Sequence, residues 1–511
     1  MIYIKACFLL STLLIAFKSI MYLLTIFQQE HYYSKNLLKT LYSFYFKKKF
    51  NYLLYINILI SYIDNIYLYV FGILISLISL FITDKTTLKL KVTNRIKRMI
   101  ITIIVIYIIL IILPLKLSLS LTLFNPFIVI ISNFINFPVE TLIRKKYIKN
   151  AKKKLKDLDL VKIAITGSYG KTSTKNIISN ILESKYICLK TPKSFNTIMG
   201  ITKVINKSLY NTHEVFVCEM GATHKKEIEQ MTKLINPSIA IITDIGPQHL
   251  DSFKTINNVL DAKFELIDNM NSDGYAILNG DNCLIKERKI TNIKNIIYYG
   301  LKETNDIYAT NIKVINGITK FSVYYKKELY IDIETKLLGE HNIKNILAML
   351  ATTIILNGTH NLNIEKENLR EEIKGLNPTK HRLSYKKIDN IHLYDDSYNS
   401  NIVGFEKAVD VIKNTPYKKI IITPGIVDCG KKTKELNELT TKYIEGVFDD
   451  IYVIDNYSGR FIYKKLEHLK QVHLFPSFFD AYQDVISKYK TEEISLLIEN
   501  DLPDNYYMRG K

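Results

Sequence analysis

LVKIAITGSYGKTST, residues 160–174, decides the fold of this chain. Its first seven residues are mostly apolar and rich in β-branched side chains, which is typical of a strand buried in a parallel sheet. A glycine turn follows from Gly167 to Thr174, and the next residues, KNIISNILESK, have a helical pattern. Strand, glycine turn and helix in this order are the context of a phosphate-binding loop. The sequence therefore predicts an α/β fold with a nucleotide site at this turn.

The turn carries groups that bind phosphate and its metal ion. Backbone N–H groups of small residues can close around phosphate oxygens, and the helix N-terminus adds a favourable dipole. We expect Lys171 to reach the β- and γ-phosphates and the Thr172 hydroxyl to hold Mg²⁺. The general pattern GxxxxGK[ST] has a glycine where this chain has Ile165, so the match is to the shorter TGxxGKT form.

Two more buried strands end in polar side chains. VFVCEMGA (215–222) ends near Glu219, and SIAIITDIGPQHLDSF (238–253) runs into a turn with His249. A carboxylate at the C-terminal end of a parallel strand lies beside the ligand crevice, so we predict that Glu219 is a metal ligand. A turn or helix-capping role is the alternative for Glu219, and a surface position is the alternative for His249. Lys263 lies in a helical stretch, where a solvated lysine is the ordinary interpretation.

The first 150 residues differ in charge and hydropathy from the rest. They hold 18 Lys and Arg against four Asp and Glu, which accounts for +14 of the net charge of +20 of the 511-residue chain. A basic excess on an apolar segment indicates a membrane partner rather than nucleic acid. Five widely spaced cysteines without a CxxC pair argue against a zinc site or a disulfide framework.

Three apolar stretches predict membrane crossings: 6–27, 66–83, and 99–138, which Pro114 and Lys116 break into a helical hairpin. A cleaved signal peptide and buried helices of a soluble protein are the alternatives. Basic clusters at 47–49, 89–98 and 144–154 should face the cytoplasm. A single crossing at 66–83 would violate this rule, so two crossings within 51–83, or a re-entrant segment at 51–62, are needed. We expect four or five crossings in the cell membrane and a cytoplasmic C-terminal part.

A series of motifs resembles the Mur ligase family, the ATP-dependent amide ligases of peptidoglycan synthesis. These motifs occur in the family's order: TGSYGKTST (166–174), SFNTIMGI (194–201), EMGATHKKEI (219–228), DIGPQHLDSF (244–253), AKFEL (262–266), ILNGDN (277–282), LLGEHNIKNILAMLA (337–351), KHRL (380–383) and DDSYNSN (395–401). EMGA and DDSYN are most similar to the branch that adds D-alanyl-D-alanine to UDP-N-acetylmuramoyl-tripeptide.

The resemblance implies which residues bind ATP. The phosphate turn would contribute Gly167, Ser168, Tyr169, Gly170, Lys171, Thr172 and Ser173. Asn196 would lie near the ATP and substrate phosphates, and His341, Asn342 and Asn345 near the base and ribose. Arg382 would approach the γ-phosphate, and Asp396 would contact the ribose.

The resemblance also implies a catalytic and metal-binding set. Lys171, His249, Lys263 and Arg382 would be catalytic. Mg²⁺ would be held by Thr172, Glu219, His249 and, if it is carbamylated, Lys263. The reaction implied is attack of a carboxylate on the γ-phosphate, giving an acyl phosphate, followed by attack of an amine. The substrates would be a muramoyl-peptide or related carboxylate and an amino acid or dipeptide.

Three domains follow from this interpretation: a membrane module at 1–150, an ATP-binding central domain with a mostly parallel sheet at 151–378, and a Rossmann-like domain at 379–511. Strands are expected at 391–395, 418–423 and 450–454, and an insert at about 297–336 alternates like antiparallel strands.

The chain departs from the family pattern at two places. The membrane module stands where related ligases hold the uridine nucleotide, and ITPGIVDCGKKTKELN (422–437) stands where a glycine- and acid-rich loop is usual, with Asp428 replacing one acid. A lipid-linked acceptor therefore stays open. So do a poly-γ-glutamate or folylpolyglutamate-type ligase and a non-catalytic ATP-binding membrane scaffold. A transporter component is disfavoured, because the sequence lacks an LSGGQ signature.

Overall fold

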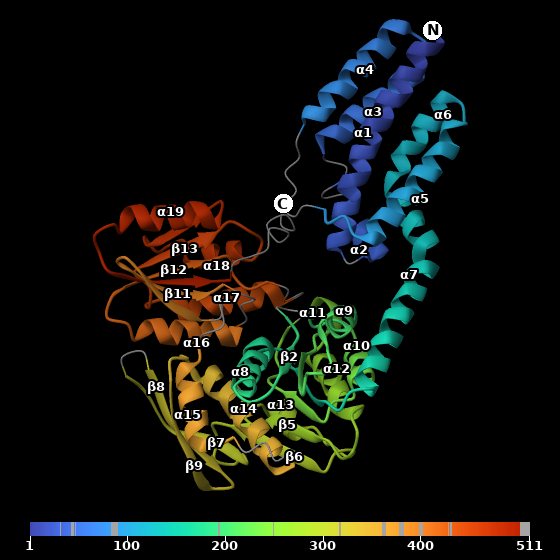
Figure 1. The fold of residues 1–511 in the computed structure, drawn as a ribbon. Helices are drawn as coiled ribbons and strands as arrows, with labels where there is room; N and C mark the ends of the chain where they lie inside the picture. The colour runs from blue at the N-terminus through green and yellow to red at the C-terminus, as the bar shows by residue number, and fades with distance from the viewer. Residues whose placement is uncertain are drawn as a thin grey trace. The chain divides into compact units, whose positions relative to one another are not determined.

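The computed structural model of the chain describes residues 1–30, 32–41, 45, 48–82, 90–192, 195–248, 250–315, 318–359, 364–377, 383–397, 402–427, 429 and 432–500. They form two compact units, residues 1–146 and 147–510 (Figure 1). The second unit contains two β-sheets. The predicted domain limits at 150 and 378 stay predictions.

The first unit is helical. Its elements are α1 (Ile2–Gln29), α2 (Ser34–Thr40), α3 (Lys49–Ser61), α4 (Ile66–Phe81), α5 (Asn94–Ile111), α6 (Leu115–Ser120), the 3₁₀ turn η2 (Leu121–Phe124) and the first part of α7 (Asn125–Lys156). The predicted break at Pro114 is confirmed, because α5 ends before this residue and α6 begins after it. A proline cannot donate the backbone hydrogen bond that a continuous helix requires.

Apolar and neutral polar side chains hold these helices together. Phe8, Ile20, Leu23 and Phe27 of α1 are buried in one cluster with residues of α3, α4 and α5. Asn57 of α3 donates to Thr12 Oγ1 in α1 at 3.1 Å and to Ser76 Oγ in α4 at 2.8 Å.

Two described helical stretches are long and apolar enough to cross a membrane, Ile2–Gln29 and Leu115–Lys156. Phe50–Ser61 and Ile66–Ser79 are apolar but shorter. Length and composition therefore mark two candidate spans, fewer than the four or five crossings predicted, and the crossing number stays a prediction.

The first sheet of the second unit has the strand order β2-β3-β1-β4-β5-β6-β7-β8-β9. Its strands are β1 (Val161–Thr166), β2 (Cys188–Lys190), β3 (Val215–Glu219), β4 (Ile239–Ile242), β5 (Tyr275–Asn279), β6 (Asn295–Gly300), β7 (Ile307–Ile315), β8 (Ile318–Tyr325) and β9 (Glu328–Thr335). Pairing is parallel from β2 to β7 and antiparallel between β7, β8 and β9. The insert is thus antiparallel as predicted, except that β6 belongs to the parallel part.

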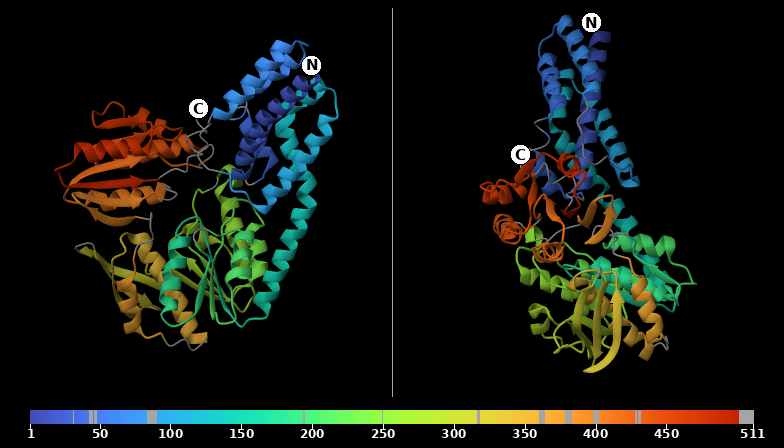
Figure 2. Two further views of the ribbon diagram at one scale, coloured as in Figure 1. Left: turned by 45° about the horizontal axis from the view of Figure 1, so that its top comes forward. Right: turned by 90° about the vertical axis from the view of Figure 1, so that its left-hand side faces the viewer.

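Helices cover both faces of this sheet, as Figure 2 shows. One face packs against α8 (Lys171–Glu183), α14 (Glu340–Thr359) and α15 (Lys366–Gly375). The other packs against the end of α7 and against α9 (Ile198–Ser208), α10 (Glu227–Ile235), α12 (Ile256–Asp268) and α13 (Cys283–Glu287), with α11 (Leu250–Phe253) nearby. Helices on both faces explain why β1, β3 and β4 consist mostly of apolar residues without a polar–apolar alternation.

The second sheet has the order β10-β11-β15-β12-β13-β14. Its strands are β10 (Ser384–Ile388), β11 (Ile391–Asp396), β12 (Lys418–Thr423), β13 (Asp450–Ile454), β14 (Val472–Phe475) and β15 (Ile494–Glu499). One face packs against α16 (Ile402–Lys413), α17 (Thr433–Ile444) and α18 (Gly459–Leu466), and the other against α19 (Phe478–Lys488). The three predicted strands are confirmed, and β10 adds an antiparallel edge.

Candidate functional site

The glycine turn joins β1 to α8, as the sequence predicts. Gly167 and Gly170 have φ values of 145° and 79°, a region that other residues rarely adopt. A Cβ atom on Gly167 would lie 2.2 Å from Thr243 Oγ1. Both the backbone conformation and the lack of space therefore require glycine at the start of the turn.

The loop after β4 holds this turn in place. The backbone N–H of Ser168 donates to Asp244 O at 2.6 Å, and the Ser168 hydroxyl donates to Gly246 O at 3.1 Å. The Thr243 hydroxyl donates to Tyr169 O. The Tyr169 ring lies against Gly246, because a Cβ atom placed on this glycine would be 2.4 Å from Cε2 of the ring. Burial of the ring raises the pKa of Tyr169 above its ordinary value. Ser168 and Tyr169 thus shape the turn through contacts of their own.

Lys171 begins α8 and its side chain curls over the turn. Its Nζ donates to Gly167 O at 2.7 Å and to Ser168 O at 2.8 Å. Thr172 and Ser173 follow in the first turn of the same helix. The ammonium group therefore lies at the glycine turn, where the sequence predicts a phosphate contact.

Glu219 ends β3 next to β1, and it has close partners. Its Oε2 lies 3.2 Å from Nζ of Lys175, and its Oε1 accepts a hydrogen bond from Asn196 Nδ2 at 3.2 Å. The side chains of Lys175 and Glu219 are only 1% and 2% exposed. Sequence reasoning missed Lys175, although its spacing of four residues from Lys171 places both on one side of a helix.

Lys263 of α12 is buried, with 1% of its surface exposed, so the solvated interpretation is wrong. Burial lowers the pKa of Lys263 to about 7, and the nearby Lys171 ammonium acts in the same direction. Its Nζ lies 6.0 Å from the centroid of the Phe253 ring. The lowered pKa raises the fraction of neutral amine near pH 7, and the neutral amine is the form that can react with carbon dioxide.

Helix α14 is joined to the phosphate helix by polar side chains. Asn345 Oδ1 accepts from the Thr174 hydroxyl at 2.9 Å, and Asn345 Nδ2 donates to Asn342 Oδ1 at 3.3 Å. His341 lies at the start of α14, against Gly339, which has a φ of 86°. The structure thus joins Asn345 to the phosphate helix and Asn342 to Asn345, and their place beside the base and ribose stays a prediction.

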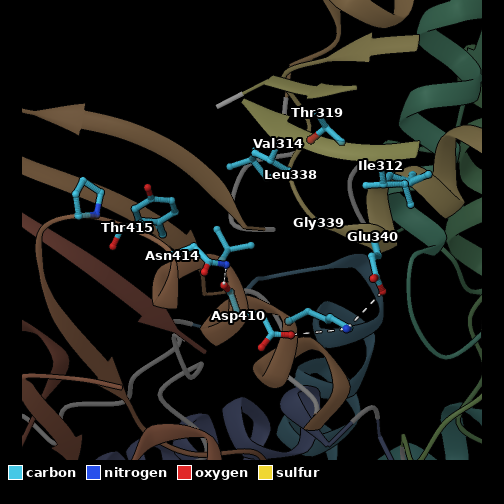
Figure 3. A pocket seen from close by; sticks show the side chains of 14 residues that line it. Ile312, Val314, Thr319, Leu338, Gly339, Glu340, Asp410, Asn414 and Thr415 are labelled. Atoms are coloured by element: carbon cyan, nitrogen blue, oxygen red, sulfur yellow. Dashed lines mark hydrogen bonds and ion pairs between the residues drawn. The ribbon is translucent and has the colours of Figure 1, made fainter. Parts of the chain in front are cut away.

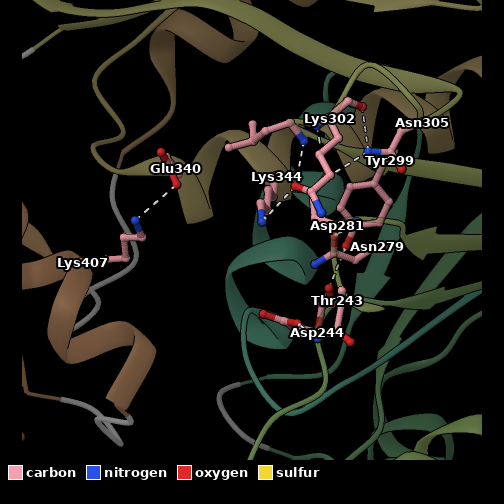
Figure 4. A network of polar contacts seen from close by, with 12 residues as sticks. Thr243, Asp244, Asn279, Asp281, Tyr299, Lys302, Asn305, Glu340, Lys344 and Lys407 are labelled. Carbon is pink, nitrogen blue, oxygen red and sulfur yellow. Dashed lines mark hydrogen bonds and ion pairs between the residues drawn. The ribbon is translucent and has the colours of Figure 1, made fainter. Parts of the chain in front are cut away.

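A network of polar contacts fixes the ends of β4 and β5 (Figure 4). The Asp281 carboxylate accepts from the backbone N–H of Leu301 at 2.8 Å and lies 3.0 Å from Nζ of Lys344 in α14. Burial favours the neutral form of Asp281, but these donors outweigh it and hold its pKa below the ordinary value. The motif ILNGDN contains Asp281, yet nothing in its spacing indicated the partner Lys344.

Asp396 ends β11 in the second sheet, directly opposite Glu499 of β15. One oxygen of Asp396 accepts from the backbone N–H of Leu383 at 2.9 Å. Glu499 is fully buried, and this burial together with the Asp396 carboxylate raises the pKa of Glu499 well above its ordinary value. His249, Arg382 and Asp428 lie outside the described residues.

A cavity of about 700 Å³ lies between the antiparallel insert, the start of α14 and α16 (Figure 3). Ile312 and Val314 of β7 form one wall, and Asp410 and Asn414 form another. An ion pair of 3.4 Å between Glu340 and Lys407 crosses it. The cavity adjoins Gly339 and Glu340, next to His341, while the described residues that line it include none from the phosphate turn.

The described residues suit a magnesium ion that is also held by nucleotide phosphates. No group of three or more His, Cys, Asp or Glu among them could hold a metal by itself. Mg²⁺ usually takes one or two protein ligands plus phosphate oxygens and water. The Thr172 hydroxyl and the Glu219 carboxylate are oxygen ligands of the kind that Mg²⁺ takes. The Glu219 carboxylate also forms the ion pair with Lys175.

Comparison with known proteins finds a matching family model, similar relatives and a similar fold. Residues 165–353 match the family model of the Mur ligase middle domain. The chain is similar to the UDP-N-acetylmuramoyl-tripeptide--D-alanyl-D-alanine ligases of Buchnera aphidicola subsp. Baizongia pistaciae and Bacillus subtilis. Identity is 32% over 53% of this chain and 57% of the first relative, and 29% over 55% of this chain and 59% of the second. The chain thus spans less than two thirds of the length of these relatives.

The fold is also similar to a solved structure, MurF ligase from Thermotoga maritima in complex with ADP. The TM-score is 0.63 at 21% identity, over 72% of this chain and 83% of that chain. This likeness concerns the fold, a mixed α/β arrangement with parallel sheets. Residues 165–353, which include the glycine turn on β1, are thus similar to the Mur ligase middle domain, and the likeness in fold extends beyond them.

Proposed function

We propose that the chain is an ATP-dependent ligase that forms a carbon–nitrogen bond between a carboxylate and an amine. The observation that carries this proposal is the position of Lys171 over a glycine turn that the loop after β4 holds in place, at the start of a helix that is bonded to α14. The curated relatives, which are named as ligases, support the same activity.

The chemistry follows from charge. A carboxylate becomes an acyl donor when its oxygen attacks the γ-phosphorus of ATP, which breaks the bond to the bridging oxygen and releases ADP. The amine then attacks the carbonyl carbon and phosphate leaves. Lys171 would offset the repulsion between the anions, and turn N–H groups would orient the phosphates. Mg²⁺, held by Thr172 and Glu219, would supply further neutralising charge.

We extend this role to the remaining predicted residues. Lys263, as a neutral amine, would carry a carbamate, with His249 as a further metal contact. Asn196, His341, Asn342 and Asn345 would line the nucleotide, and Arg382 and Asp396 would approach it from the second sheet.

The proposed substrates are a muramoyl-peptide carboxylate and D-alanyl-D-alanine, as in the named reaction of the relatives. The experiment incubates the full chain in membranes with ATP, Mg²⁺, candidate muramoyl-peptides and hydroxylamine. A hydroxamate identifies the activated carboxylate, and we expect it with the muramoyl-tripeptide. Lys171→Ala should yield none, and Lys207→Ala, which changes an exposed lysine on α9, should match the parent.

Each competing function has a distinct result in this assay. A hydroxamate formed with a glutamyl or folyl substrate would indicate a poly-γ-glutamate or folylpolyglutamate-type ligase. Nucleotide binding with neither hydroxamate nor ADP, across all carboxylates, would indicate a scaffold and would overturn the ligase proposal.

We further propose that residues 1–146 embed the protein in the cell membrane, with the second unit in the cytoplasm. Large exposed apolar side chains are concentrated in this unit. Lys18, a charge within α1, donates to the carbonyls of Ser79 and Ile82 at the end of α4, which reduces the cost of placing it in lipid.

Two exposed native cysteines test the orientation, Cys7 in α1 and Cys283 in α13. We expect a membrane-impermeant maleimide to label Cys283 in opened cells and not in intact cells. The full chain should also resist carbonate extraction. Release by carbonate would contradict membrane embedding, and labelling of Cys283 in intact cells would contradict the orientation.

A further inference from the structure

The buried ion pair between α8 and β3 has a role beyond packing. Lys175 Nζ lies 3.2 Å from Glu219 Oε2, and both side chains are almost completely withdrawn from water. Lys175 follows Lys171 by one helical turn, so the pair involves the same helix that begins at the phosphate turn. A buried ion pair is costly to break on one side, because the remaining charge is left uncompensated.

The surroundings fix Glu219 from several directions. Asn196 Nδ2 donates to its second oxygen at 3.2 Å, and the Thr191 hydroxyl accepts from its backbone N–H at 3.1 Å. Asn196 lies close against Gly221, because a Cβ atom placed on this glycine would be only 2.7 Å from the Asn196 side chain. The amide therefore has little room to move. The carboxylate is therefore held at one position, with an ammonium group on one oxygen and an amide on the other.

A divalent cation that uses Glu219 must share this carboxylate with Lys175. Two positive charges a few ångströms apart in a poorly solvated site repel each other strongly. The same ammonium also supplies the countercharge that keeps the carboxylate stable when it has no other cation. The geometry therefore links the strength of metal binding to a lysine that lies outside the phosphate turn.

We propose that Lys175 is a positioning residue that weakens and tunes divalent-cation binding at Glu219 by competing for its carboxylate. This inference rests on the proposed function, because it takes Glu219 as a cation contact. The cation affinity at Glu219 is then lower than it would be without Lys175. A cation would then bind firmly together with nucleotide phosphates, which add oxygen ligands and negative charge.

The test measures binding of Mn²⁺ alone to the full-length protein, by electron paramagnetic resonance of free Mn²⁺. Glu219→Gln supplies the background, since it removes the charge and keeps the shape. We expect Lys175→Met, which keeps the stem and removes the charge, to tighten Glu219-dependent Mn²⁺ binding at least tenfold. Lys175→Arg keeps the charge and should stay within about twofold of the parent.

A second measurement guards against a folding defect. Without Mn²⁺, Lys175→Met should lower the thermal midpoint, and the double variant Lys175→Met with Glu219→Gln should regain most of that loss. Unchanged or weaker Mn²⁺ binding in a folded Lys175→Met protein would overturn the proposal and leave the pair a structural one. Equal Mn²⁺ binding by the parent, Lys175→Met and Glu219→Gln would also overturn it. These outcomes do not depend on the substrate, so a failed hydroxamate assay would leave them interpretable.

Discussion

The two units of this protein bury different kinds of polar side chains. In the described part of residues 1–146, the buried polar residues are Ser, Thr and Asn. In the second unit they include Lys175, Glu219, Lys263, Asp450 and Glu499. Neutral polar groups between helices can satisfy one another by hydrogen bonds, whereas a buried charge is costly unless it is paired. The contrast teaches that the second unit, unlike the described part of the first, buries Lys, Asp and Glu side chains, and that Lys175, Glu219 and Lys263 among them lie on β3 or on helices that pack against the first sheet.

Lys171→Ala tests the charged site most severely. Loss of the ammonium group removes the charge that offsets the phosphates, and we expect ADP formation to fall at least about 1,000-fold. Measured on the same membranes, the amount of inserted protein should not change. ADP formation within tenfold of the parent would show that the turn is not the phosphate site.

Lys263→Met removes a buried amine whose pKa is lowered to about 7. Between about pH 7 and 10 the unfolded chain binds a proton there that the folded chain does not, so folding of the parent gains stability as pH rises. At pH 7 the free energy of unfolding of Lys263→Met should therefore exceed that of the parent, by at most about 4 kcal/mol. This advantage should shrink by about 1.4 kcal/mol per pH unit above pH 7.

Denaturant unfolding of the full chain in carbon-dioxide-free buffer measures this effect. Lys207→Met, at an exposed site on α9, is the control and should show no such trend. A constant difference between Lys263→Met and the parent across this pH range would mean that Lys263 is charged in the folded state.

Glu499→Gln distinguishes a protonated from an ionised carboxyl. Because the folded pKa is raised, the parent's stability from this group is fully present below about pH 4.5 and is lost as pH rises through the folded pKa. Glutamine mimics the protonated acid and cannot ionise, so the variant avoids that loss. The free energy of unfolding of the variant minus that of the parent should therefore be about 1–3 kcal/mol larger at pH 8 than at pH 5. Glu499→Ala, which leaves a cavity, should destabilise at both pH values. A stability difference between the variant and the parent that is the same at pH 5 and pH 8 would show that Glu499 is already ionised over this range.

Asn57→Leu tests the neutral core of the first unit and should have the smallest effect. The amide bonds to Thr12 and Ser76, and hydrogen bonds of this kind between helices in membranes contribute about 0.6 kcal/mol on average. Thermal unfolding in detergent should shift by no more than a few degrees, with ADP formation unchanged. A large shift would mean that this core behaves like the charged sites of the second unit.

The sequence predicted the elements that have a local pattern. The strands β1, β3 and β4, the glycine turn and the break at Pro114 could be recognised because apolar runs, glycines and prolines act on their immediate neighbours. Partners far apart in the chain could not be recognised. Lys175 meets Glu219 across 44 residues, and Glu499 meets Asp396 across 103, so only the strand order brings them together.

Exposure was equally hard to predict. Lys263 looks like any helical lysine in the sequence, and its burial depends on the packing of α12 against the sheet. A role for Lys263 is implied by the resemblance to the Mur ligase family and not by any pattern of spacing.

The glycine turn has a consequence for the rate of nucleotide capture. Thr243, in the loop after β4, holds the turn, and Asn345 holds the helix that follows the turn through Thr174. The conformational entropy of this turn is therefore lost when the chain folds and not when a ligand arrives. A preorganised turn of this kind needs no ordering step, so encounter and electrostatic attraction, rather than loop rearrangement, should set the speed of nucleotide association.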